Sequence, residues 1–177
     1  MKANLLPHIP FLKQPNISTD LNILHVGCGN SSISEDLYDL GLRNIIGIDF
    51  CEPVIHIMQD RKDKSKRTSL NYQVMDARGL RFNDKLFDLV IDKGCVDSMV
   101  CTPSGLSESR QFVSTYFREV ARVLKAGGYY VLVSCGIDDT NNLLKFKDFG
   151  WETLFSGKIK PKEGLNMEVS LTIIRSK

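Results

Sequence analysis

Several kinds of segment are missing from this chain of 177 residues. No run approaches the ~20 consecutive apolar residues that a membrane-spanning helix needs, and the N-terminus lacks the basic-then-apolar order of a signal peptide. With 23 lysines and arginines against 21 acidic residues, the net charge of +2 provides no strong field toward nucleic acid or anionic lipid. We therefore expect a cytoplasmic protein whose partners are neither nucleic acids nor membranes.

Metal-binding and disulfide patterns are also missing. The five cysteines are odd in number and form no C-x-x-C pair, and the three histidines form no H-x₃-H pair. No metal site and no disulfide framework are therefore predicted. The composition, 42% hydrophobic and 25% charged, is that of an ordinary globular domain. The length suits one domain, which we assign to residues 21–177, after an N-terminal segment over residues 1–20.

Short apolar runs rich in branched residues alternate along the chain with segments of helical periodicity. This alternation predicts an α/β fold with a doubly wound, mostly parallel sheet and helices on both faces. Near the end, strands at 151–156 and 167–174 are joined by a link too short for a helical crossover, so we expect an antiparallel hairpin at one edge. The other strands are predicted at 23–26, 44–49, 70–75, 86–92 and 129–134, for a total of seven, and helices at 32–41, from Pro53, at 106–124 and at 141–149.

Two local patterns sharpen this outline. Ser32 followed by Glu35 predicts a reciprocal capping box at the start of the first helix. The basic residues between 61 and 67 are diluted by Asp60 and Asp63, so we interpret this segment as a solvated linker rather than a nucleic-acid patch.

Functional groups are expected at the carboxyl ends of the strands, where open α/β sheets bind their ligands. Four predicted strand ends carry a glycine turn, Gly27-Cys28-Gly29, and the carboxylates Asp49, Asp76 and Asp92. Because parallel strands end at the same edge of a sheet, these groups should converge on one rim.

Each of these groups has an adenosine-binding interpretation and a plainer one. Glycines let the backbone pass close beneath a ligand, or merely form a tight turn. Asp49 can accept hydrogen bonds from both hydroxyls of a ribose, or cap the next helix. Asp76 can accept from an adenine amino group, with the Ala77 amide beside the ring, or end a turn. Met75 can pack on the base, or on the core.

An adenosine site leaves two classes of enzyme, nicotinamide dehydrogenases and S-adenosylmethionine (SAM) transferases. A dinucleotide fingerprint requires a third glycine where this chain has Ser32. The predicted terminal hairpin is also foreign to a dinucleotide fold. Both features favour a transferase.

Four segments resemble, in order, motifs of the class I, seven-stranded SAM-dependent methyltransferases. They are residues 24–32 (LHVGCGNSS), 47–50 (GIDF), 75–77 (MDA) and 124–128 (LKAGG). The resemblance implies SAM as the cofactor. It further implies a set of cofactor-binding residues, namely Gly27, Cys28, Gly29, Asn30, Asp49, Phe50, Met75, Asp76, Ala77 and Asp92.

Within that class, the segment D-K-G-C-V-D at 92–97 and G-C-G-N-S at 27–31 resemble the branch that methylates a lysine of translation elongation factor 1-alpha. Relatives of this branch include an enzyme acting on a mitochondrial metabolic protein, so the resemblance implies a protein substrate more firmly than a particular one. We expect a monomer or weak dimer. The implied catalytic residues are Asp92, Lys93, Gly94 and Asp97.

Our hypothesis is that Asp92, with backbone carbonyls near Lys93 and Gly94, orients the substrate ammonium while Asp97 holds the loop. The plainer alternative is a surface ion pair between Lys93 and Asp97. We expect the acceptor to approach through the loops at 96–107 and 157–166, because variable loops above a scaffold carry specificity. A small-molecule methyltransferase and a non-catalytic binding module stay open as alternatives.

The chain departs from the family pattern at two places. His25 stands where the class usually has an acid beneath the glycine turn, and a neutral imidazole would fill the same place. Family members also carry an N-terminal helix that closes over the cofactor, whereas residues 1–20 contain Pro7, Pro10 and Pro15. We interpret residues 1–20 as a remnant of that lid, with the alternatives that the chain is truncated there or that the lid comes from elsewhere.

Overall fold

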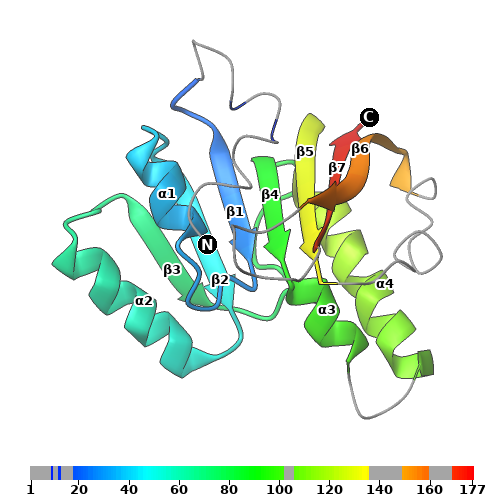
Figure 1. The fold of residues 1–177 in the computed structure, drawn as a ribbon, viewed down its shortest axis with the longest axis horizontal. Coiled ribbons are helices and arrows are strands. Elements are labelled where there is room, and N and C mark those ends of the chain that lie inside the picture. The colour runs from blue at the N-terminus through cyan, green and yellow to red at the C-terminus, as the bar shows by residue number, and fades with distance from the viewer. Residues whose placement is uncertain (1–8, 10–11, 13–17, 102–105, 136–148, 160–168) are drawn as a thin grey trace.

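One sheet organises the part of the chain that the computed structural model describes, which is Ile9, Leu12 and residues 18–101, 106–135, 149–159 and 169–177 (Figure 1). Its seven described strands lie in the order β3-β2-β1-β4-β5-β7-β6. β3, β2, β1, β4 and β5 are parallel to one another, and β7 is antiparallel to both β5 and β6. This confirms the predicted seven-stranded sheet and its antiparallel hairpin. The strands are β1 (Asn22–Val26), β2 (Asn44–Asp49), β3 (Leu70–Val74), β4 (Phe87–Lys93), β5 (Leu124–Ser134), β6 (Trp151–Ile159) and β7 (Val169–Ser176).

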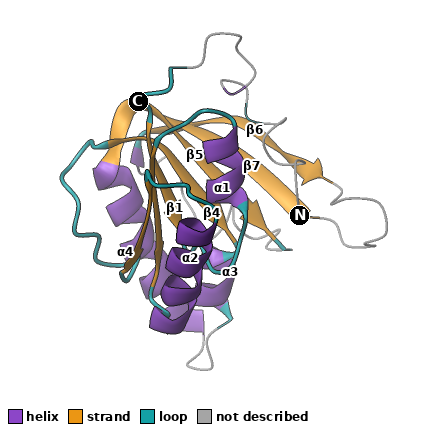
Figure 2. Ribbon diagram, turned by 90° about the vertical axis from the view of Figure 1, so that its left-hand side faces the viewer, coloured by secondary structure: helices purple, strands orange, loops and turns teal. Residues whose placement is uncertain are grey.

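Helices cover both faces of the sheet, as predicted. Side chains of α1 and α2 pack with one set of alternating strand residues, including Ile23 and Ile91, and side chains of α3 and α4 pack with the other set, including Leu24 and Val90. Figure 2 shows the sheet edge-on between these helices, as one twisted layer. The described helices are α1 (Ile33–Asp39), α2 (Glu52–Lys64), α3 (Cys95–Val100) and α4 (Leu106–Val123).

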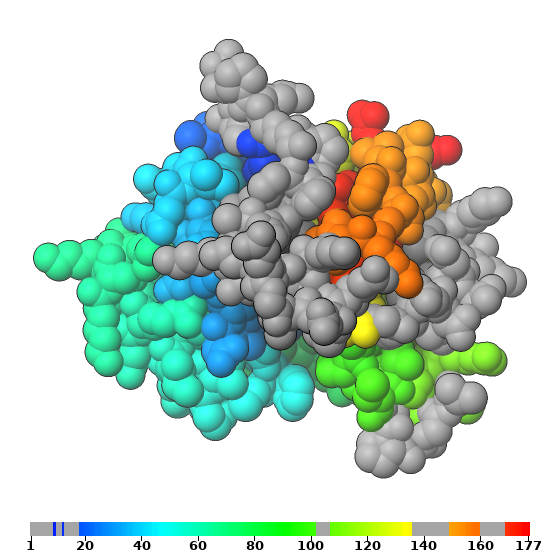
Figure 3. All heavy atoms as spheres, viewed as in Figure 1, coloured from blue at the N-terminus to red at the C-terminus, as the bar shows by residue number. Residues whose placement is uncertain are grey.

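The two ends of the sheet form opposite flanks of the molecule. In Figure 3, β6 lies at one side of the molecule and α2, which packs on β2 and β3, at the other. Within the described residues no helix is long and apolar enough to cross a membrane.

Two local predictions are wrong. Ser32 makes no capping hydrogen bond to the first turn of α1; its hydroxyl donates to Asp36, and Glu35 forms an ion pair with Arg61 instead. The segment interpreted as a solvated linker is partly helical, because α2 continues to Lys64. The basic side chains at its end find carboxylate partners on α1, and this pairing fixes the segment against the fold.

The boundaries of other elements also differ. β5 begins at Leu124, which pairs with Phe87, and a register shift opposite Asp88 accommodates Gly127 in the left-handed conformation (φ 76°). The six-residue helix α3 lies where we expected a loop. Most of the helix predicted at 141–149, most of the insertion at 157–166, and most of residues 1–20 lie outside the described residues.

Candidate active site

The glycine turn after β1 has a backbone that only glycine adopts without strain. Gly27 and Gly29 have φ angles of 55° and 50°. Between them, the Cys28 amide donates to the Ile48 carbonyl of β2 at 2.9 Å. A Cβ atom on Gly27 would lie 2.6 Å from the Cβ of Cys95, so the turn is in direct contact with the start of α3.

Asp49 joins the end of β2 to this turn. Its Oδ2 accepts a hydrogen bond from the Gly29 amide at 2.9 Å, and its Oδ1 accepts one from the Cys51 amide, also at 2.9 Å. Next to it, the Phe50 ring is 78% exposed and lines the pocket described below. The carboxylate is therefore fixed at the rim beside an aromatic ring that is free to contact a ligand.

Arg61 of α2 contacts the glycine turn, a contact that the sequence interpretation missed. Its guanidinium donates to the Asn30 carbonyl at 3.1 Å and to the Ser31 carbonyl at 3.0 Å, and it forms an ion pair with Glu35 of α1. An arginine fork can hold several acceptors at once, so Arg61 fixes the second half of the glycine turn. The only signal for it in the sequence was its place in the mixed-charge run after Pro53.

His25 lies beneath the turn, fully buried. Its Nδ1 is 2.9 Å from the hydroxyl of Ser34 on α1, whereas its Nε2 has no hydrogen-bond partner within the described residues. Burial, together with the positive charge of Lys93, lowers the pKa of His25 to about 3. The imidazole is therefore neutral and connects β1 to α1.

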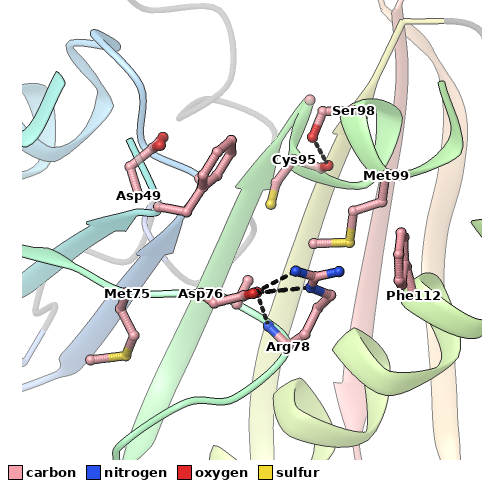
Figure 4. Close-up of a pocket in the computed structure, with 12 residues that line it drawn as sticks. Asp49, Met75, Asp76, Arg78, Cys95, Ser98, Met99 and Phe112 are labelled. Atoms are coloured by element: carbon pink, nitrogen blue, oxygen red, sulfur yellow. Dashed lines mark hydrogen bonds and ion pairs between the residues drawn. The ribbon is translucent and has the colours of Figure 1, made fainter. Parts of the chain in front are cut away.

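A cavity of about 460 Å³ opens at the carboxyl ends of β1, β2, β3 and β4. Figure 4 shows Asp49 and Met99 on opposite sides of it, with Cys95 between them. The structure brings seven of the predicted site residues to its wall, together with five others. The predicted ones are Gly27, Asp49, Phe50, Met75, Asp76, Ala77 and Gly94; the others are Arg78, Cys95, Ser98, Met99 and Phe112.

Asp92 lies behind this wall instead of lining it, with no exposed surface. It accepts hydrogen bonds from the Cys95 amide at 2.8 Å, from the Tyr116 hydroxyl at 2.8 Å and from the Tyr130 hydroxyl at 3.2 Å. Burial raises the pKa of this carboxyl to about 6, although the tyrosine and amide hydrogen bonds oppose the shift. In this arrangement Asp92 holds the start of α3, and α3 lines the cavity.

The rest of the D-K-G-C-V-D segment turns the chain from β4 into α3. Gly94 has a φ of 77°, and its amide donates to the Val133 carbonyl of β5 at 2.9 Å. Asp97 accepts from the Ser134 hydroxyl at 2.6 Å and from the Cys135 amide at 3.1 Å. These contacts with the end of β5, rather than a bond to Lys93, occupy the Asp97 carboxylate.

The remaining predicted residues do not line the cavity: Cys28, Gly29 and Asn30 form the glycine turn, and Lys93 is the last residue of β4. The cavity fits an adenosyl group on three counts. Its volume lies within the roughly 300–1,000 Å³ typical of small-molecule sites. It has carboxylates at two places, Asp49 and Asp76, and it offers an exposed aromatic ring and two methionines as apolar walls.

Comparisons with known proteins agree with this geometry. The methyltransferase domain family matches residues 24–132. The chain is 39% identical over 112 residues to the eEF1A lysine and N-terminal methyltransferase of Bos taurus, which covers 63% of the chain and 16% of that protein. It is 34% identical over 124 residues to the EEF1A lysine methyltransferase 4 of Mus musculus, covering 68% of the chain and 48% of that protein.

Solved structures share the fold at low sequence identity. A SAM-dependent methyltransferase from Methanosarcina mazei superposes with a TM-score of 0.73 at 19% identity, covering 90% of this chain and 93% of that one. The magnesium protoporphyrin IX methyltransferase of Synechocystis, solved with bound SAM, superposes with a TM-score of 0.66 at 17% identity, covering 89% and 71%.

The chain therefore belongs to the methyltransferase domain family. Its fold is that of the class I SAM-dependent methyltransferases, as its motifs indicated, and the expected cofactor of the class, S-adenosylmethionine, is confirmed with it. The chain spans less than half the length of the curated relatives named above.

Proposed function

We propose that this chain methylates a lysine side chain of a protein, with translation elongation factor 1-alpha as the first candidate substrate. The observation that carries the proposal is the meeting of two features at one cavity. Gly27, Asp49 and Asp76 supply its adenosyl-binding side, and the D-K-G-C-V-D segment supplies the turn and helix opposite. The curated relatives that match this chain are named for eEF1A lysine methylation, which supports the same substrate.

In this proposal the cofactor lies along the rim. Asp49 accepts hydrogen bonds from the ribose hydroxyls, and Phe50 and Met75 pack on the base beside Asp76 and Ala77. The glycine turn passes beneath the methionine end, with Gly27 at the cavity wall. Gly94 and Cys95 close the cavity from the side of α3.

Transfer requires alignment more than it requires a side-chain nucleophile. The neutral lysine nitrogen attacks the methyl carbon, the carbon–sulfur bond breaks, and S-adenosylhomocysteine leaves with the electron pair. Holding the two reactants in line accounts for much of the rate, since well-oriented reactions reach effective molarities of ~10⁵ M or more. The lysine must first lose a proton from a group with a pKa of roughly 10.4, which an apolar approach and the cofactor's positive sulfur favour.

Asp92 and Asp97 then act as positioning residues. Asp92 holds the first amides of α3, and Asp97 ties that helix to the end of β5. Direct orientation of the ammonium would come from backbone carbonyls near Lys93 and Gly94. The Lys93 side chain is partly exposed beside this turn.

The test is a transfer assay with SAM and purified elongation factor 1-alpha, read as a mass gain of one or more methyl groups on a lysine-containing peptide. Asp49→Ala serves as the cofactor-binding control. Methylation of a low-molecular-mass fraction but of no protein would favour the small-molecule alternative. A purified chain that binds neither SAM nor S-adenosylhomocysteine in calorimetry would favour the non-catalytic module. Cytoplasmic location, a monomer or weak dimer, and the absence of nucleic-acid binding stay predictions.

A further inference from the structure

The side chain of Arg78 folds back onto Asp76, at the cavity wall. Nη2 of Arg78 donates to Oδ2 of Asp76 at 2.6 Å, and Nε lies 3.0 and 3.1 Å from the two carboxylate oxygens. The backbone amide of Arg78 adds a further bond to Oδ1 at 2.8 Å. Both oxygens of Asp76 are therefore occupied by one neighbouring residue.

Arg78 also contacts the opposite element of the site. Its guanidinium carbon lies 4.5 Å from the centre of the Phe112 ring on α4. The cation thus spans from the loop after β3 to α4, and Figure 4 shows it between Asp76 and Phe112. A guanidinium held on an aromatic face by a carboxylate keeps a defined orientation.

This placement of Arg78 conflicts with a direct hydrogen bond from the adenine amino group of the proposed cofactor to Asp76. An adenine amino group needs a free acceptor on Asp76, but three N–H groups of Arg78 already make four contacts with the two oxygens of this carboxylate, which has about four acceptor positions in all. The adenine amino group therefore competes with the Arg78 side chain for the acceptor positions of Asp76.

We propose that Arg78 competes with the adenine amino group for Asp76, and so sets how tightly and how selectively the pocket holds the base. The proposal rests on the proposed binding of an adenosyl cofactor in this cavity. Arg78 and Asp76 are 39% and 48% exposed, so their ion pair is weak enough to open when a ligand arrives. The competition is therefore expected to change affinity about two- to fivefold rather than to prevent binding.

The experiment compares two uncharged nucleosides, adenosine and purine riboside, which lacks the amino group. Their dissociation constants are measured by calorimetry for the wild-type chain, for Arg78→Met, and for the control Arg81→Met. Arg81 is a nearby exposed arginine that donates to the Val74 carbonyl and does not line the cavity. Methionine at position 78 keeps an apolar side chain beside Phe112 but removes the side-chain hydrogen bonds to Asp76, so that only the backbone amide of residue 78 still donates to that carboxylate.

We expect Arg78→Met to bind adenosine about two- to fivefold more tightly while its affinity for purine riboside stays the same. Arg81→Met should match the wild type for both nucleosides. Unchanged or weaker adenosine binding by Arg78→Met would overturn the competition, while leaving the cofactor site intact. A wild-type chain that binds neither adenosine nor S-adenosylhomocysteine would instead overturn the proposed function itself.

A second measurement uses the wild-type chain alone. Raising the salt concentration from about 0.05 M to about 0.5 M screens the exposed ion pair, whereas neither nucleoside carries a charge. We expect adenosine to gain affinity relative to purine riboside as salt rises. An identical salt response for the two nucleosides would contradict the proposal.

Discussion

The Gly29 amide nitrogen donates a hydrogen bond to Oδ2 of Asp49 at 2.9 Å, and this bond joins the turn after β1 to the end of β2. One carboxylate thereby sets the shape of the glycine turn before any ligand arrives. Since Oδ1 is held by the Cys51 amide, both oxygens are fixed in place, and their remaining lone pairs are available at the rim. The turn and the acid are therefore one unit.

Replacing Asp49 by asparagine should weaken S-adenosylhomocysteine binding by roughly tenfold or more. The side-chain amide nitrogen of asparagine would replace one of the two acceptor oxygens, and a hydrogen bond to a charged group contributes about 1.5–3 kcal/mol. Calorimetry measures the affinity. Asp60→Asn, at an exposed position of α2, is the matched control and should bind as the wild type does. Equal affinities for both variants would exclude Asp49 from the cofactor site.

Alanine substitutions in the glycine turn should separate the cost of backbone strain from the cost of a steric clash with Cys95. Gly27→Ala combines a positive φ with a Cβ placed 2.6 Å from Cys95, so we expect it to lower the free energy of unfolding by about 1–3 kcal/mol and to abolish ligand binding. Gly29→Ala has a similar φ but open space around the new Cβ, so it should cost about 1 kcal/mol. Gly79→Ala, with no positive φ and no neighbour within 4 Å, should be nearly neutral. Urea unfolding would measure all three, and equal losses at positions 27 and 29 would contradict the role of Cys95.

Arg61 offers a test of how the turn is held. Lysine at this position keeps the charge but not the fork that reaches Asn30, Ser31 and Glu35 together. We expect Arg61→Lys to lower the free energy of unfolding by about 1–2 kcal/mol and to weaken cofactor binding. Arg118→Lys, at an exposed position of α4, should change neither quantity. An Arg61→Lys chain with wild-type stability and affinity would remove Arg61 from the site.

The sequence was informative wherever a feature depends on neighbours along the chain. The alternation of apolar residues located β2 at the bounds found, Asn44–Asp49, and the glycine spacing located the turn. The acids at strand ends followed from the rule that parallel strands present their carboxyl ends at one edge. These predictions needed no knowledge of distant contacts.

Features that depend on distant contacts were missed. α3 is a different case: its N-cap is a left-handed glycine without a side chain, and its first amide is held by Asp92, three residues earlier, so the usual capping signal is missing although the contact is local. Arg61 reaches the glycine turn from a segment whose charges resembled a solvated linker. Glu35 had a local partner available in Ser32, yet the arginine on α2 forms the stronger interaction. Polar partners chosen across the fold are not encoded in spacing.

The buried carboxyl of Asp92 should make the free energy of unfolding depend on pH. Its pKa is about 6 in the folded chain against an ordinary 3.8, so the folded state binds the proton more tightly than the unfolded state does. The free energy of unfolding therefore falls as pH rises from about 4 to about 6, by about 3 kcal/mol for this one group. His25 acts in the opposite direction, because its pKa of about 3 in the folded chain lies below 6.5, and acidification over the same range favours unfolding.

Asp92→Asn separates the two contributions. Asparagine can accept from the Cys95 amide and donate to the tyrosine hydroxyls, so the fold is kept while the titrating group is removed. The stability of Asp92→Asn relative to the wild type should rise by about 3 kcal/mol between pH 4 and pH 7, since His25 contributes equally to both chains and cancels. Urea unfolding at a series of pH values measures this difference. A difference in stability between the wild type and Asp92→Asn that does not change with pH would show that Asp92 does not titrate in this range. Tyr116→Phe should shift the Asp92 transition to higher pH, because it removes a hydrogen-bond donor that favours the charged carboxylate.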